Sequence, residues 1–132
     1  MEISIFERIN AIEECYEFML AYAGRGLPSE DGGQIREFLQ RAAEAITGLA
    51  GNNALSIEEE SLEPAEKYRA FFAVLDRDAR DSLAAIELAL AQPSISSQMI
   101  DNLNASIHLR ALLTDLFLIG DILRSRVASG PV

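Results

Sequence analysis

The sequence predicts an all-α protein, an up-and-down four-helix bundle. Two observations predict this fold class. Apolar residues recur at spacings of three and four along most of the chain, and no run alternates with period two. Hydrophobic residues make up 49% of the 132 residues, which is enough for a core. We expect a single domain over residues 1–132, ordered from about 3 to 127, with a frayed tail at 128–132.

The first predicted helix begins at Ser4, whose hydroxyl caps the first turn while Glu7 reaches back to it. The glycines and the proline of AGRGLPSEDGG end this helix near residue 23. Spacings of four and three give it one apolar stripe, which predicts the side of the helix that faces the core: Ile5, Ile9, Ile12, Tyr16, Leu20 and Ala23.

The second predicted helix has two clear faces and ends at the GNN of residues 51–53. Its apolar face is Ile35, Phe38, Leu39, Ala42, Ile46 and Leu49, and its polar face is Arg36, Glu37, Gln40, Arg41 and Glu44.

The third predicted helix opens near Ser61, with Pro64 in its first turn, and Pro93 follows its end. Its predicted core stripe is Tyr68, Phe71, Phe72, Leu75, Ala79, Leu83, Ile86 and Leu90.

The fourth predicted helix starts between Ser94 and Ser97 and runs to about Val127, so the two C-terminal helices are expected to be the longer pair. Between Ala111 and Leu123 its apolar residues have no single side, which is typical of a helix buried all round. Because a bundle of this size rarely surrounds one helix, we predict a homodimer with this helix near the two-fold axis. The predicted interface residues are Leu112, Leu116, Ile119, Gly120, Ile122, Phe18 and Tyr22.

The composition excludes several classes of function. The formal net charge is −10 and the basic residues form no stripe, so we expect no binding to nucleic acid or to anionic membranes. The lone Cys15 can form no disulfide within the chain, which fits a reducing cytoplasm. The N-terminus lacks the pattern of a secretory signal, and no apolar run approaches the roughly 20 residues of a membrane span. We also expect no cofactor.

One row of ionisable residues in the fourth predicted helix is a candidate ligand or metal site. Asp101, His108 and Asp115 recur at intervals of seven and so share one side of a continuous helix. The same pattern also fits an ordinary histidine at the rim of an interface, bonded to a carbonyl or a carboxylate. A di-iron centre is excluded because its Glu-x-x-His pairs need more than one histidine.

A second candidate site lies in the first predicted helix, where EECYE brings together Glu13, Glu14 and Glu17. This cluster resembles the first magnesium-binding motif of the all-α nucleotide pyrophosphohydrolases of the MazG type. The resemblance implies carboxylates from two helices that hold Mg²⁺, which orients water against a phosphate. The second motif of that family, Glu-x-x-Asp, is missing from the next helix. The alternative interpretation is a solvated acidic face.

These observations predict a small acidic cytoplasmic protein for interaction or accessory roles, a class that includes regulators, without catalytic machinery of its own. Two alternatives come from other classes. One is a metal-dependent nucleotide phosphohydrolase that uses the Glu13 cluster, and the other is a helical bundle that binds a small ligand or a metal through His108 and Asp115.

Overall fold

The computed structural model describes residues 5–30, 33–51 and 61–129, apart from the side chains of 50, 51 and 127–129. Within these residues the all-α prediction is confirmed, because every regular element is a helix. The predicted cap at Ser4, residues 52 and 53 of the GNN terminator and residues 130–132 of the predicted tail lie outside the described residues. Residues 128 and 129, predicted to belong to that tail, are the last two residues of α5. The helices are α1 (Ile5–Ala23), α2 (Gln34–Gly51), α3 (Ala65–Leu90), α4 (Ser97–Ala105) and α5 (His108–Ser129).

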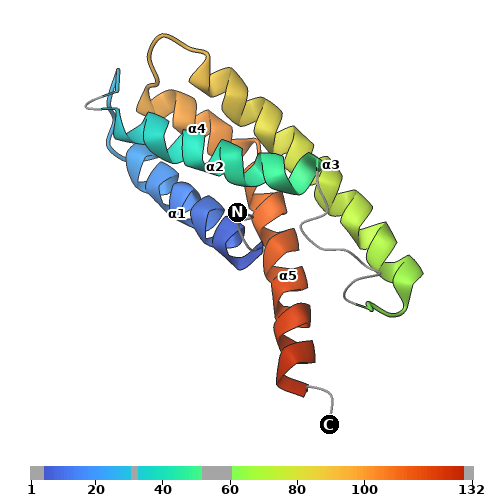
Figure 1. The fold of residues 1–132 in the computed structure, drawn as a ribbon. Helices are drawn as coiled ribbons and strands as arrows, with labels where there is room; N and C mark the ends of the chain where they lie inside the picture. The colour runs from blue at the N-terminus through green and yellow to red at the C-terminus, as the bar shows by residue number, and fades with distance from the viewer. Residues whose placement is uncertain (1–4, 31–32, 52–60, 130–132) are drawn as a thin grey trace.

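The helices pack around one apolar core. α2 lies between α1 and α3, α4 packs mainly on α1, and α5 packs on α3 and α1 (Figure 1). α5 turns away from α4, and its C-terminal half extends past α1 and α2 (Figure 1). That half therefore has fewer helices around it than the start of α5. None of the described helices has the length and apolar character needed to cross a membrane.

The predicted fourth helix is two helices, and this part of the sequence-based prediction is wrong. Ser96 caps α4 by accepting a hydrogen bond from the Met99 amide at 3.1 Å, so the predicted start is correct. The helix then ends at Ala105, because Ile107 adopts a left-handed backbone with φ 64° that no α-helix continues through. α5 begins at the next residue in a new direction.

The start of α3 also differs from the prediction. Ser61 has φ 52°, and Pro64 is the extended N-cap residue rather than part of the first turn. A left-handed residue cannot open a right-handed helix, so α3 begins at Ala65. The predicted end is correct, since Ala91 caps the helix just before Pro93.

The core face of α1 follows a different stripe in its second half. The predicted Tyr16 is only half-buried and Leu20 is 52% exposed, whereas Cys15, Met19 and Tyr22 are buried. The buried positions recur at an average spacing below the 3.6 residues of one helical turn, so the buried side drifts around α1 and ends one position before the predicted stripe. The core stripe of α2 is largely as predicted, with Ile35, Leu39 and Ile46 among the buried residues. Of the predicted stripe of α3, three residues are buried and the other five are half-buried; the buried ones are Leu75, Ala79 and Ile86.

Candidate functional site

The predicted row of Asp101, His108 and Asp115 is separated in the structure. The break at Ile107 places Asp101 on α4 and the other two on α5. Asp101 is exposed and borders a polar hollow beside the connection between α1 and α2. His108 is exposed and lines a groove of about 370 Å³ that Leu88 of α3 also lines. Asp115 is half-buried against α3.

The predicted glutamate cluster lies along α1. Glu14 and Glu17 are exposed, and Glu13 is half-buried. Across the described ranges of the chain, no three His, Cys, Asp or Glu residues come together in a group that could hold a metal ion. Neither of the predicted metal-ligand sets is therefore assembled by the described part of the fold.

Most of the residues predicted at a dimer interface are buried inside one chain. Leu112 and Leu116 are fully buried, and Ile119 is 1% exposed. Gly120 is buried against α1, where a Cβ atom would lie 3.6 Å from the Ile9 side chain. α1 and α3 both pack on α5, and these four residues are buried within one chain, so they do not by themselves require a second copy. The homodimer stays a prediction.

The remaining predicted interface residues fall into two places. In α1, Tyr22 is buried, and the half-buried Phe18 stacks on Phe38 of α2 with ring centroids 4.3 Å apart. Ile122 of α5 is different, because it is half-buried and lines an open groove between α5 and α3. Of the seven predicted residues, Ile119 and Ile122 line this groove, and Ile122 is the more exposed of the two.

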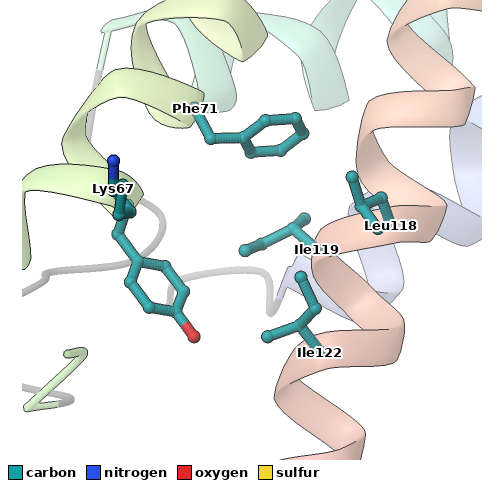
Figure 2. A pocket seen from close by; sticks show the side chains of 6 residues that line it. Lys67, Phe71, Leu118, Ile119 and Ile122 are labelled. Atoms are coloured by element: carbon teal, nitrogen blue, oxygen red, sulfur yellow. The ribbon is translucent and has the colours of Figure 1, made fainter. Parts of the chain in front are cut away.

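This α3–α5 groove has a volume of about 310 Å³ and an almost entirely apolar lining. Figure 2 shows Phe71 directed from α3 toward Leu118 and Ile119 of α5 across an open space. Leu118 is 50% exposed, and its neighbour Phe117 is 42% exposed. Apolar side chains of this size at the surface are typical of a surface that another molecule covers. The groove is lined by Lys67, Tyr68, Phe71, Leu118, Ile119 and Ile122.

A pair of carboxyl groups lies in the contact between α3 and α5, which we call the α3–α5 seam. These are Asp78 of α3 and Asp115 of α5, both half-buried. Burial, and then the neighbouring Asp78, raise the pKa of Asp115 to about 7. The Oδ2 atom of Asp115 is buried and has no hydrogen-bond partner. Asp115 is therefore harder to ionise than an ordinary aspartate.

No family model, curated protein or solved structure matches this chain.

Sequence reasoning found Asp115 and Ile122 but missed the residues of α3 that face them. Tyr68 and Phe71 were assigned to the core, although their exposed edges form one wall of the groove. The sequence did not indicate that Asp78 is half-buried, because an aspartate in RDARD is typical of a solvated face. Its position seven residues after Phe71 could have placed it on the same side of α3.

Cys15 is enclosed by the core, and burial raises the pKa of its thiol to about 12, although the charge of Arg41 acts in the opposite direction. Because the thiolate is the reactive form, we predict that the native protein reacts with a disulfide reagent at least about a hundredfold more slowly than the unfolded chain. The release of the chromophore from Ellman's reagent, with and without denaturant, measures both rates. Equal rates would contradict the burial of Cys15.

Proposed function

We propose that this chain is a cytoplasmic interaction protein without a catalytic site of its own, built as a four-helix bundle whose fourth member is the bent α4–α5 pair. In this proposal it acts as a homodimer, and the second copy docks on the α3–α5 groove. The observation that carries the proposal is the open apolar groove beside the exposed Phe117 and Leu118. The lone, buried Cys15 supports a reducing compartment.

The distribution of charge supports a second copy as the occupant. Two chains that each carry a net charge of −10 repel one another over most of their surfaces. The groove walls differ from the rest of the chain. On the first turns of α3 and on the end of α5 the basic side chains outnumber the acidic ones, although Glu63 and the glutamates of 58–60 precede α3: Glu66, Lys67 and Arg69, then Asp121, Arg124 and Arg126. Repulsion between two copies is therefore smaller at these helix ends than over the rest of the chain.

The arrangement of the helices gives the same surface a shape that suits two-fold pairing. The projecting half of α5 presents Leu118 and Ile122 beside the hollow that Tyr68 and Phe71 border. In an isologous dimer the ridge of each copy can lie against the groove of the other. Burial of the exposed leucine and phenylalanine then contributes roughly 25 cal/mol for each Å² of apolar surface removed from water.

We predict that Leu118→Glu abolishes the dimer, because it places a charge in the apolar contact and leaves it without a partner. Sedimentation velocity of the wild-type chain should give the mass of two copies, and the variant should give the mass of one. Leu20→Glu is the matched control, since Leu20 is a 52% exposed leucine on α1. The control should remain dimeric, and circular dichroism should show an unchanged helix content in both variants.

Three results would contradict this proposal. A wild-type chain that sediments as a monomer at micromolar concentration would remove the dimer. Loss of the dimer in Leu20→Glu but not in Leu118→Glu would place the interface elsewhere. Magnesium-dependent release of pyrophosphate from nucleotides, abolished by Glu14→Gln, would favour the phosphohydrolase alternative.

A second candidate function, the binding of a small ligand, is favoured by the groove at His108. That groove is mostly apolar, with His108, Asn102 and Gln92 as polar groups at its edge. Native mass spectrometry of protein purified without a metal-affinity step tests it directly. A dimer mass with nothing bound supports the first proposal, whereas additional mass that is lost in His108→Ala supports the second.

A further inference from the structure

The outer face of α3 is a row of exposed residues on the side of the helix that turns away from the bundle. They recur at spacings of four and three, which is the pattern of a helix seam that packs against another helix. Val74 is 39% exposed and Leu88 is 68% exposed, so this face holds large apolar side chains in water. The outer face comprises Ala70, Val74, Arg77, Asp81, Ala84 and Leu88.

The outer face adjoins the surface that the proposed dimer buries. Ala70 follows Lys67 by about one turn, and Lys67 lines the α3–α5 groove. At the other end of the face, Leu88 lines the groove at His108. α3 lies at the edge of the bundle (Figure 1). A partner that covers the α3–α5 groove from this edge therefore meets the outer face of α3 as well.

The charges at the middle of the outer face are complementary to those of a second copy. Residues 77–81 read RDARD, and two antiparallel copies of this segment centred on Ala79 bring each arginine opposite an aspartate. Arg77 lies two residues before Ala79 and Asp81 lies two residues after it, so Arg77 of each copy faces Asp81 of the other. Both side chains are exposed, and no ion pair of the described residues includes either of them. The face thus offers two contacts between opposite charges to another copy of itself.

The same alignment pairs large apolar side chains with small ones. Val74 and Ala84 lie five residues on either side of Ala79. Ala70 and Leu88 lie nine residues on either side of it. The valine and the leucine of one copy therefore face alanines of the other, which lets the two helices approach closely and interdigitate. Removal of these exposed side chains from water favours the association.

Antiparallel registers that are shifted by one heptad lose these pairings. If one copy moves along the other by seven residues, Arg77 comes opposite Val74 or Leu88, depending on the direction. Asp81 then comes opposite an alanine. Each charge would lie in the contact without a partner, which is unfavourable. The sequence of the outer face therefore favours the register centred on Ala79.

We propose that the second copy of the dimer docks with its α3 antiparallel to α3 of the first copy, with the two-fold axis at the level of Ala79. This inference rests on the proposed homodimer, and it assigns the element and the register with which the second copy covers the α3–α5 groove. Leu88 of the second copy then lies at Ala70, beside the Lys67 edge of that groove. RDARD carries two positive and two negative charges, so the centre of the contact is neutral although each copy carries a net charge of −10.

Charge reversal on the outer face tests this register. The two-fold axis creates two contacts between aspartates in Arg77→Asp, and two contacts between arginines in Asp81→Arg. Sedimentation velocity should give each variant a dissociation constant at least about tenfold above that of the wild type. Arg77→Asp makes the chain more negative and Asp81→Arg makes it less negative, so a change in net charge does not account for both losses. Arg110→Asp, at an exposed position of α5, is the matched control and should dimerise as the wild type does.

A mixture of the two single variants gives a reading that a purely structural role of these residues would not produce. In their heterodimer the aspartates of one copy face the arginines of the other at both contacts. The heterodimer should therefore form with the affinity of the wild type, although neither variant pairs well with itself, and native mass spectrometry identifies it by its mass. The double variant Arg77→Asp/Asp81→Arg should likewise recover the dimer. Circular dichroism checks that every variant keeps its helix content.

The α3 register is overturned if the wild type is a dimer that both charge reversals leave unchanged, and Leu118→Glu then still decides the proposed dimer. It is also overturned if both reversals dissociate the dimer and their mixture does not restore it. A wild-type chain that is a monomer at micromolar concentration overturns the proposed function, and this inference with it.

Discussion

Leu112→Ala should lower the free energy of unfolding by about 2–5 kcal/mol, the range for truncation of a fully buried leucine. Leu112 is 0% exposed and belongs to the core that α1, α3 and α5 share. The loss has two parts, the hydrophobic transfer energy of the removed atoms and the cavity that the neighbouring helices do not fill. Urea denaturation followed by circular dichroism gives the free energy from the midpoint and the slope.

Leu118→Ala is the matched control for this substitution. The same atoms are removed from the same helix, but Leu118 is 50% exposed, so the free energy of unfolding of the monomer should change by less than about 1 kcal/mol. The pair separates two explanations for the apolar character of α5. If Leu112 lay at a contact between copies, its replacement would weaken association and leave a stable monomer. Similar losses for the two variants at low protein concentration would contradict the burial of Leu112 within the chain.

The core of this protein can be predicted from its sequence because apolar residues at helical spacing indicate which side of a helix is buried. The leucines and isoleucines of α2 recur at helical spacing and are buried as expected, including Leu39 and Ile46. This spacing does not indicate whether another helix of the same chain or a second molecule covers an apolar side. Most of the apolar residues of α5 are buried as expected, but α1 and α3 cover Leu112 and Leu116 within one chain, where the sequence alone suggested a second copy, and Leu118 is 50% exposed.

The break between α4 and α5 had little local signal. Asn104 and Ser106 favour turns, but Ile107 is a β-branched residue, which rarely adopts a positive φ. Ile107 is itself 60% exposed, and its amide donates to the nearby Asn104 carbonyl at 3.1 Å. The break also separates the predicted site, because Asp101 and His108 lie on one side of a helix only if that helix is unbroken between them. The α3–α5 groove was missed for a related reason, since it depends on how far two helices diverge.

Polar residues on a predicted exposed face are the other class that sequence reasoning misassigned. Arg36 was placed on the polar side of the second helix, but the structure uses it to hold three segments together. Its Nε donates to Glu30 at 2.7 Å, and its Nη1 and Nη2 donate to the carbonyls of Leu90 and Gln92 at 2.9 and 2.6 Å. Glu30 in turn accepts from the Ile95 amide at 3.1 Å. The end of α3 and the connection to α4 are thus attached to the start of α2.

Arg36→Ala should lower the free energy of unfolding by about 2–3 kcal/mol, because it removes charge-assisted hydrogen bonds from a partly buried site and leaves the Leu90 and Gln92 carbonyls without this donor. Arg36→Lys should recover only part of the loss, since an ammonium group cannot match the planar arrangement of the guanidinium donors. Urea denaturation at pH 7 measures both variants.

Arg80→Ala provides the comparison for this cluster. Arg80 donates to Asp76 at 2.9 Å one turn away on α3, but both side chains are largely exposed, and such pairs contribute about 0.3–0.5 kcal/mol.

The pH dependence of Arg36→Ala gives a second test of the cluster. The hydrogen bond from Arg36 holds the pKa of Glu30 below its ordinary value. The cluster therefore stabilises the fold above the unfolded-state pKa, about 4.3, and that contribution is lost as the pH falls through the folded value. Arg36→Ala should thus cost less at pH 3 than at pH 7, whereas an equal cost at both pH values would show that packing of the arginine stem, rather than the ion pair, attaches α3 to α2.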